Sequence, residues 1–240
     1  MENETSPCPL QRGIETENGL PCAPSKGGEQ FSPFGGDRGG FAVFLSTAYL
    51  APVQYYSKLV SYKTVWIETC ETYPKQTYRN RCMIATANGI QSLSVPVEHP
   101  ETEKCLTKDI RISDHGNWQH IHWNALVSGY GMSPFFEYYE DDFAPFYRQK
   151  YRFLIDFNEQ LRSTICELLD IHPDVSYTTE YHPEIADDFR TAIRPRQPVV
   201  DNTFMPKPYY QVFREKHGFL PNLSIIDLLF NMGPEAVMVL

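Results

Sequence analysis

Short apolar runs separated by polar turns mark the first half of the chain. Their length and their β-branched and aromatic content are typical of buried strands. Asn88-Gly89 lies between two of these runs and favours a two-residue hairpin turn. The pattern predicts strands at residues 41–45, 65–67, 82–86, 91–95 and 109–113, with a short helix or turn at 49–59.

The second half has apolar residues at three- and four-residue steps, which is the spacing of amphipathic helices. Helices are expected at residues 118–130, with Asn117 as the N-cap, and at 156–169, with Asp156 as the cap. Shorter helical segments are predicted from Ser133 and at 141–147. Ser224 and Asp227 have the spacing of a capping box before the last helix.

The order of these elements indicates the fold class. Strands dominate before residue 115 and helices after it, and six prolines in residues 172–210 leave room there only for brief elements and ordered loop. We therefore expect an α/β or α+β fold, with a mixed sheet from the N-terminal half and helices mainly from the C-terminal half. The length predicts a single domain.

Composition separates residues 1–40 from the rest. They hold 8 of the 14 Gly and 5 of the 19 Pro, a share typical of disordered segments. We expect a flexible Gly/Pro-rich extension, or a segment that results from a mis-assigned start, followed by a domain at residues 41–240.

Charge narrows the possible partners. The chain has 21 Lys+Arg, 30 Asp+Glu and a net charge of -9, whereas nucleic-acid binding usually needs a basic surface. The N-terminus has no secretory signal pattern, and the uncharged residues 39–57 contain Pro52 and Gln54, so no membrane span is expected. The six cysteines form no C-x-x-C pair, which predicts reduced thiols in a cytoplasmic protein.

The densest polar cluster lies at residues 75–81, between two predicted strands. Lys75, Arg79 and Arg81 supply three cations. Tyr78 and Asn80 add a phenol and an amide. Such groups bind phosphate or carboxylate, and a strand beginning at Arg79 would place Arg79 and Arg81 on one face. The alternative is a solvated loop in which an arginine pairs with a carboxylate.

Candidate acid–base groups come from carboxylates and a histidine. Glu68 and Glu71 follow the second predicted strand, next to the cations, and structural pairing is the alternative to catalysis there. His122 lies on the apolar stripe of a predicted helix, as a core histidine or as an acid–base group. His120 and His122 point in different directions on a helix, so no metal site is predicted. The sequence identifies no cofactor.

Several separated motifs occur in one order along the body of the chain. They are residues 49–58, 75–81 with Ile84 and Asn88-Gly89, 93–97, 110–112, Trp118 with His122, Tyr130, Pro134 and 221–227. Together they resemble the WbqC-like protein family, whose founding members lie among surface-polysaccharide (O-antigen) biosynthesis genes. A lysine, an aromatic residue and an Asn-Arg pair recur in the family pattern, and Lys75, Tyr78, Asn80 and Arg81 fill those places.

The resemblance implies a bacterial, cytoplasmic protein of surface-polysaccharide biosynthesis. It implies a transferase that uses a phosphate-bearing activated donor, either a nucleotide-sugar or an acyl donor. In such a transferase Lys75, Arg79 and Arg81 would neutralise the anionic donor. Asn80 and Tyr78 would orient the acceptor. The alternative is a non-catalytic module that binds a nucleotide, a glycan or a protein.

The resemblance also assigns the remaining candidates. Tyr49 and Tyr55, within the first motif, join the predicted substrate-binding residues. Glu68 or Glu71 would act as the base, because Thr69 takes the place of the family's acidic residue. Many members carry His-Gln-Pro-Asn at the position where this chain has Leu-Ser-Thr-Ala at residues 45–48.

Overall fold

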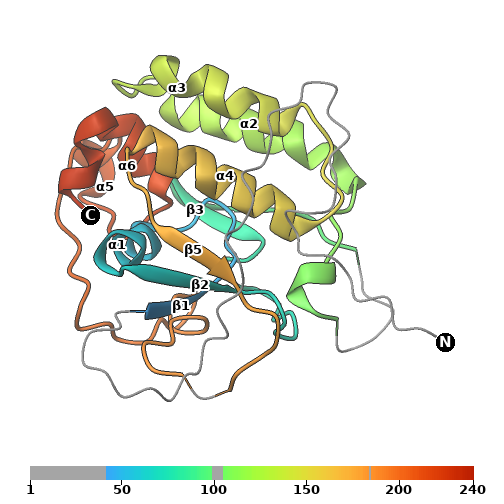
Figure 1. The fold of residues 1–240 in the computed structure, drawn as a ribbon. Helices are drawn as coiled ribbons and strands as arrows, with labels where there is room; N and C mark the ends of the chain where they lie inside the picture. Colours follow the sequence, from blue (N-terminus) through green and yellow to red (C-terminus); the bar gives the residue numbers. More distant parts are fainter. Residues whose placement is uncertain (1–41, 99–104, 184) are drawn as a thin grey trace. The chain divides into compact units, whose positions relative to one another are not determined.

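The computed structural model describes residues 42–98, 105–183 and 185–240 (Figure 1). All of these residues belong to one compact unit, Phe41–Leu240. The extension expected at residues 1–40 lies outside the described residues.

Three parallel strands form the first sheet, in the order β1-β2-β5. β1 (Ala42–Ser46) pairs with β2 (Thr64–Glu68), and β2 pairs with β5 (Asp174–Tyr177). Helix α1 (Val53–Ser61) provides the crossover that a parallel β1–β2 pair requires. The apolar runs predicted β1 and β2. They did not predict β5, which lies in the proline-rich segment and has no fully buried residue.

An antiparallel hairpin forms a separate, two-stranded sheet. β3 (Arg81–Thr86) pairs with β4 (Gly89–Ser94) around the turn at residues 87–88. The hairpin prediction is confirmed, although the turn lies one residue earlier than expected, because Gly89 already pairs with Thr86. Gly89 has a φ of 105°, a conformation that favours glycine. The mixed α/β class is confirmed as well, with the parallel and antiparallel strands in different sheets.

The helices follow mainly in the second half. They are α2 (Trp118–Tyr130), α3 (Phe136–Phe143), α4 (Leu154–Leu168), α5 (Arg214–His217) and α6 (Ile225–Met232), with the short 3-10 helices η2 (Thr107–Asp109), η3 (His115–Asn117), η4 (Ala144–Tyr147) and η5 (Gly233–Met238). α4 runs beside the parallel sheet (Figure 1), and its Glu159 accepts hydrogen bonds from Thr47 at 2.9 Å and Tyr177 at 3.2 Å. These contacts join α4 to the strand ends.

Two predicted elements differ from the structure. Residues 109–113 are not a strand: η2 ends at Asp109, and beyond it Arg111 and Ile112 make single bridges to Phe153 and Val97. Ile112 is still buried, so its apolar side chain indicated burial rather than pairing. Helix α4 begins at Leu154 instead of Asp156. Asp156 lies in the first turn, where a carboxylate is favourable next to the helix dipole.

Two predicted side-chain caps are also wrong. Asn117 precedes α2 with a left-handed φ of 47°, and its side chain makes no capping bond. Ser224 precedes α6, yet its hydroxyl donates to the carbonyl of Leu50 at 2.7 Å instead of capping the helix. A long-range contact has therefore replaced the local capping box.

The segment before α6 pairs with the segment between β1 and α1. The amide of Val53 donates to Leu223 at 2.9 Å, and the amide of Ile225 donates to Ala51 at 2.8 Å. The adjoining Leu50 has a left-handed φ of 41°, unusual for a branched residue. These bonds fix two sequence-distant motifs against each other.

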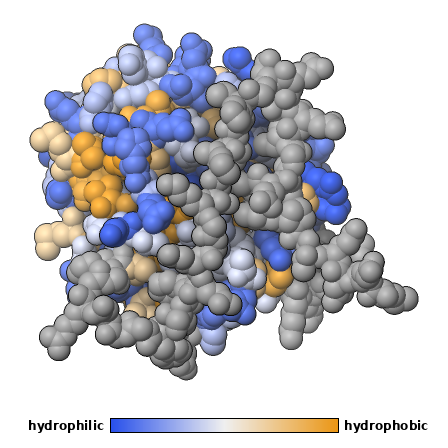
Figure 2. Space-filling model, viewed as in Figure 1, coloured by the Kyte–Doolittle hydropathy of each residue, from blue (hydrophilic) through white to orange (hydrophobic). Residues whose placement is uncertain are grey.

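The surface of the described residues is mixed. Figure 2 shows hydrophobic residues gathered on the left of the view, over the C-terminal elements, and η5 carries exposed Val237 and Met238. In the described part of the chain, no helix combines the length and the apolar character needed to cross a membrane.

Candidate functional site

The carboxyl ends of the three parallel strands meet at one edge of the sheet. β1 ends at Ser46, β2 at Glu68 and β5 at Tyr177. The residues that follow β2 and β5 are tied together, because the Thr69 amide and hydroxyl donate to Thr178 at 3.0 and 2.8 Å. Ligands of open α/β sheets usually bind outside this edge.

Glu68 is the first charged group at the edge, and it is fully buried. Its carboxylate accepts hydrogen bonds from the Thr178 hydroxyl at 2.7 Å and the Cys70 amide at 2.8 Å. Arg190 pairs with its other oxygen at 2.8 Å. Asp188 holds the same guanidinium at 2.7 Å, so Glu68 and Asp188 share Arg190 as their partner.

Glu71 and Arg79 form a second buried pair. Nε and Nη2 of Arg79 each donate to one Glu71 oxygen at 2.7 Å, and Nη2 also donates to the Arg190 carbonyl at 3.0 Å. Burial raises the pKa of Glu71, although the Arg79 guanidinium acts in the opposite direction. The charge of Arg79 is therefore neutralised inside the protein. This matches the alternative stated for the polar cluster, in which an arginine pairs with a carboxylate.

We call Glu68, Glu71, Arg79, Asp188 and Arg190 the sheet-edge charge cluster. Three carboxylates and two guanidinium groups give it a net charge of about -1. The sequence pattern missed Arg190 and Asp188, because both lie in the proline-rich segment, more than 100 residues from Glu68. Only the long-range packing of that segment reveals them.

The two other cations of residues 75–81, which we call the basic loop, lie differently. Lys75 is exposed and Arg81 is half-buried. No carboxylate of the described residues forms an ion pair with either side chain. β3 begins at Arg81, so the condition for placing Arg79 and Arg81 on one strand face is not met. Among the described residues, the charges of Lys75 and Arg81 are therefore not used in ion pairs.

Several buried polar atoms in and beside the basic loop lack a hydrogen-bond partner among the described residues. They are the Tyr73 hydroxyl, Asn80 Oδ1, Arg81 Nε and Asn158 Oδ1. The amide nitrogens of Asn80 and Asn158 are used, since they donate to the carbonyls of Val95 and Arg79 at 2.9 and 2.8 Å. Unsatisfied buried polar atoms are few in native proteins, and each needs an explanation. Tyr73 was not among the residues predicted from the sequence.

The predicted tyrosines lie in the interior. Tyr78, Tyr49 and Tyr55 are all buried. The carbonyl of Tyr78 accepts a bond from the Tyr49 amide at 2.9 Å, and burial raises the pKa of Tyr78 to about 12. The Tyr55 hydroxyl is buried with no partner among the described residues. None of the three sits beside exposed Lys75 as a surface group.

His122 belongs to a buried hydrogen-bond chain. Its Nδ1 lies 2.9 Å from the Tyr49 hydroxyl, which in turn lies 2.9 Å from the Tyr147 hydroxyl. Trp118 packs its ring edge against the imidazole, with centroids 5.1 Å apart. Burial lowers the pKa of His122 to about 4, so the ring is neutral at pH 7. We call Tyr49, His122 and Tyr147 the tyrosine–histidine chain.

A metal centre has no support within the described ranges. Across residues 42–98, 105–183 and 185–240, no three His, Cys, Asp or Glu side chains are grouped to hold a metal ion.

The described residues thus define a mixed α/β protein with a buried charge cluster at the carboxyl edge of a small parallel sheet and a cationic loop attached to it. Comparison with models of protein families identifies the family of the chain. The chain belongs to the WbqC-like protein family, whose model matches residues 47–194 and 196–239. The match covers the sheet-edge charge cluster, the basic loop and the tyrosine–histidine chain.

One relative among curated proteins is Rv1507c of Mycobacterium tuberculosis (strain ATCC 25618 / H37Rv), an uncharacterized protein. It is 28% identical over 196 residues, which cover 68% of this chain and 81% of the relative. No solved structure matches the chain.

Proposed function

We propose that this protein binds the phosphate-bearing part of an activated sugar or acyl donor at the basic loop, and that it transfers the activated group in surface-polysaccharide biosynthesis. Lys75 and Arg81 bind the anion, and the Tyr73 hydroxyl donates to it. Asn80 Oδ1 accepts from the acceptor. Arg79 positions the loop through its bond to Glu71 instead of contacting the donor.

One observation carries the proposal. A buried guanidinium nitrogen of Arg81, in the basic loop, and the buried hydroxyl of Tyr73, beside the loop, have no partner among the described residues, on a protein whose net charge is -9. Desolvating such donors without a partner costs about 1–3 kcal/mol each. An anion that accepts from both removes this cost, because phosphate oxygens are strong acceptors.

Glu71 is the better base of the two predicted glutamates. Its side chain is 7% exposed, whereas Glu68 is 0% exposed. A raised pKa also makes a carboxylate a stronger base near neutral pH. His122 is set apart in the tyrosine–histidine chain.

A second candidate is a binding module without catalysis. It is favoured by the pairing of every predicted acid–base group: Glu68 with Arg190, Glu71 with Arg79, and His122 with Tyr49. Within the described residues, no carboxylate at the basic loop is left without a cationic partner to serve as a base. This candidate uses the same anion-binding residues, so only turnover separates the two.

The test is a calorimetric titration with UDP-glucose, acetyl-coenzyme A and inorganic pyrophosphate. We expect at least one donor to bind, and the double variant Lys75→Ala/Arg81→Ala to bind it at least about a hundredfold more weakly, since each charged contact contributes about 1.5–3 kcal/mol. The matched control is Lys63→Ala/Lys150→Ala, which removes the same charge from two exposed residues. Its affinity should stay within about twofold of the wild type.

The outcomes are distinct. Unchanged affinity in Lys75→Ala/Arg81→Ala, with an unaltered circular dichroism spectrum, contradicts the proposed site. Donor consumption in the presence of a cell extract supports the transferase. Retention of the donor without consumption favours the binding module.

A further inference from the structure

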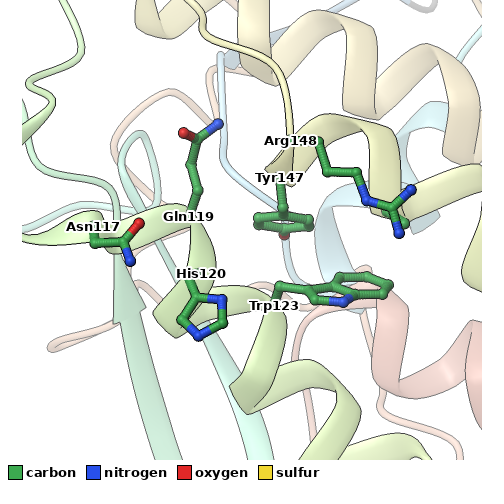
Figure 3. A pocket seen from close by; sticks show the side chains of 7 residues that line it. Asn117, Gln119, His120, Trp123, Tyr147 and Arg148 are labelled. Carbon is green, nitrogen blue, oxygen red and sulfur yellow. The ribbon is translucent and has the colours of Figure 1, made fainter.

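A cavity separate from the basic loop lies between the start of α2 and the end of η4 (Figure 3). Its volume is about 350 Å³, near the lower end of the roughly 300–1,000 Å³ typical of ligand pockets. The side chains that line it include Asn117, Gln119, His120, Trp123, Tyr147 and Arg148. The size fits a small ligand.

One wall of the cavity is aromatic. Figure 3 shows the ring of Tyr147 above the ring of Trp123, and their centroids are 5.6 Å apart with an interplanar angle of 33°. Trp123 packs on Phe136 from behind at 6.1 Å, and the Tyr147 hydroxyl is bonded to Tyr49. Both rings are held in place. Tyr147 is only 6% exposed and Trp123 is half-buried, so the apolar surface open to a ligand comes mainly from Trp123.

The polar rim supplies donors and acceptors around this wall. Asn124 Nδ2 donates to His120 Nε2 at 2.9 Å, which places the imidazole proton on Nδ1. Gln119 Nε2 donates to the carbonyl of Gln149, so its Oε1 is left as an acceptor. The side-chain amide of Asn117 makes no capping hydrogen bond with α2 and adds a further polar group to the rim. Several directional hydrogen-bonding groups therefore surround one apolar surface.

The charge of the rim is positive. Arg148 is exposed and forms no ion pair with a described residue, and no residue lining the cavity is a carboxylate. In Figure 3 Arg148 extends on one side of the rings, and Asn117 and Gln119 lie on the other. A ligand lying across the rings would therefore meet a guanidinium at one end and amides at the other.

We propose that this cavity binds an acidic monosaccharide, a sugar ring that carries a carboxylate. The apolar face of the ring stacks on Trp123, which Tyr147 supports, the carboxylate pairs with Arg148, and the hydroxyls bond to the amide and imidazole groups. An aromatic acid has one polar group, whereas a sugar ring offers several hydroxyls to the amide and imidazole groups of the rim. The proposal uses none of the residues of the basic loop, so it stands independently of the proposed function.

The experiment is an NMR titration of the full chain with sodium glucuronate, glucose and sodium benzoate, observed at the indole N–H of Trp123. We expect glucuronate to shift this signal, and glucose to bind about tenfold more weakly because it lacks the charge. Arg148→Gln should weaken glucuronate binding about tenfold. The matched control Lys150→Gln removes a charge two residues away that does not line the cavity; Lys150 is 77% exposed, and affinity should change less than about twofold.

Three results overturn the proposal. They are an unshifted Trp123 indole signal at saturating glucuronate, equal affinity in Arg148→Gln and Lys150→Gln, and binding of benzoate in preference to glucuronate. The Lys75→Ala/Arg81→Ala variant separates the two proposals. It should bind glucuronate like the wild type, and a loss of binding there would assign glucuronate to the basic loop.

Discussion

The sheet-edge charge cluster and the tyrosine–histidine chain bury polar groups in two different ways. At the sheet edge, Arg79 and Arg190 enter the protein as charges, each against a carboxylate at 2.7–2.8 Å. In the chain, His122 enters as a neutral ring between aromatic side chains. Charges removed from water must be compensated by partners, whereas a neutral ring needs only hydrogen bonds. The first region should therefore be sensitive to loss of a partner and the second to pH.

The largest expected effect is loss of one charge from a buried pair. Arg79→Met leaves Glu71 unpaired, and we expect the free energy of unfolding to fall by about 3–5 kcal/mol. The double variant Arg79→Met/Glu71→Leu should recover most of that loss, because it buries no charge at this position. Urea unfolding followed by circular dichroism measures both.

An exposed pair serves as the control for this prediction. Lys150 and Asp114 are 77% and 70% exposed, and Lys150→Met should change the free energy of unfolding by no more than about 1 kcal/mol. If Arg79→Met has an equally small effect, the Arg79–Glu71 pair is not buried in solution.

The second effect tests the tyrosine–histidine chain through pH. Burial lowers the pKa of His122 from 6.5, its value when exposed, to about 4 in the folded protein. The unfolded state therefore binds the proton more readily between these values, and the contribution of the neutral ring to stability, fully present above pH 6.5, is lost as pH falls toward 4. We expect a loss of about 3 kcal/mol over this range, relative to His122→Asn.

The measurement is the free energy of unfolding of both proteins at pH 7, 5.5 and 4. The direction in which the stability difference between the two proteins changes with pH is the decisive result. If the wild type keeps its advantage over His122→Asn at pH 4, the ring is not buried in its neutral form.

The smallest expected effect on the free energy of unfolding concerns Tyr147, the last member of the tyrosine–histidine chain. Tyr147→Phe removes one hydrogen bond but leaves Tyr49 bonded to His122, so we expect a loss of about 1 kcal/mol in thermal or urea unfolding. Tyr138→Phe, at a side chain that is 75% exposed, should have no measurable effect. A loss above about 3 kcal/mol for Tyr147→Phe would indicate that this hydroxyl does more than satisfy its partner.

The sequence predicted those elements in which buried and exposed side chains follow a regular local spacing. β1, β2, the hairpin and α2 follow from runs, turn residues and helical spacing. β5 was missed because Asp174–Tyr177 is short and half-buried, and it is held by pairing with β2. The predicted cap at Ser224 was also wrong because of a long-range contact: its hydroxyl donates to the distant carbonyl of Leu50.

The candidate site divides in the same way. The sequence placed Glu68 and Glu71 next to a cationic segment, which the structure confirms as a location. It did not show that Arg79 is paired internally, or that Arg190 comes from the proline-rich segment, because ion pairs between distant segments leave no local signal. The functional roles of these residues stay predictions.

The bond between Ser224 and Leu50 spans 174 residues of sequence. During synthesis, the β1–α1 connection leaves the ribosome long before its partner segment exists. The left-handed backbone at Leu50 and the buried face of α1 must wait for α6, because contacts between distant residues form late and slow folding. The N-terminal strands of this protein therefore complete their packing only after α6 has been synthesised.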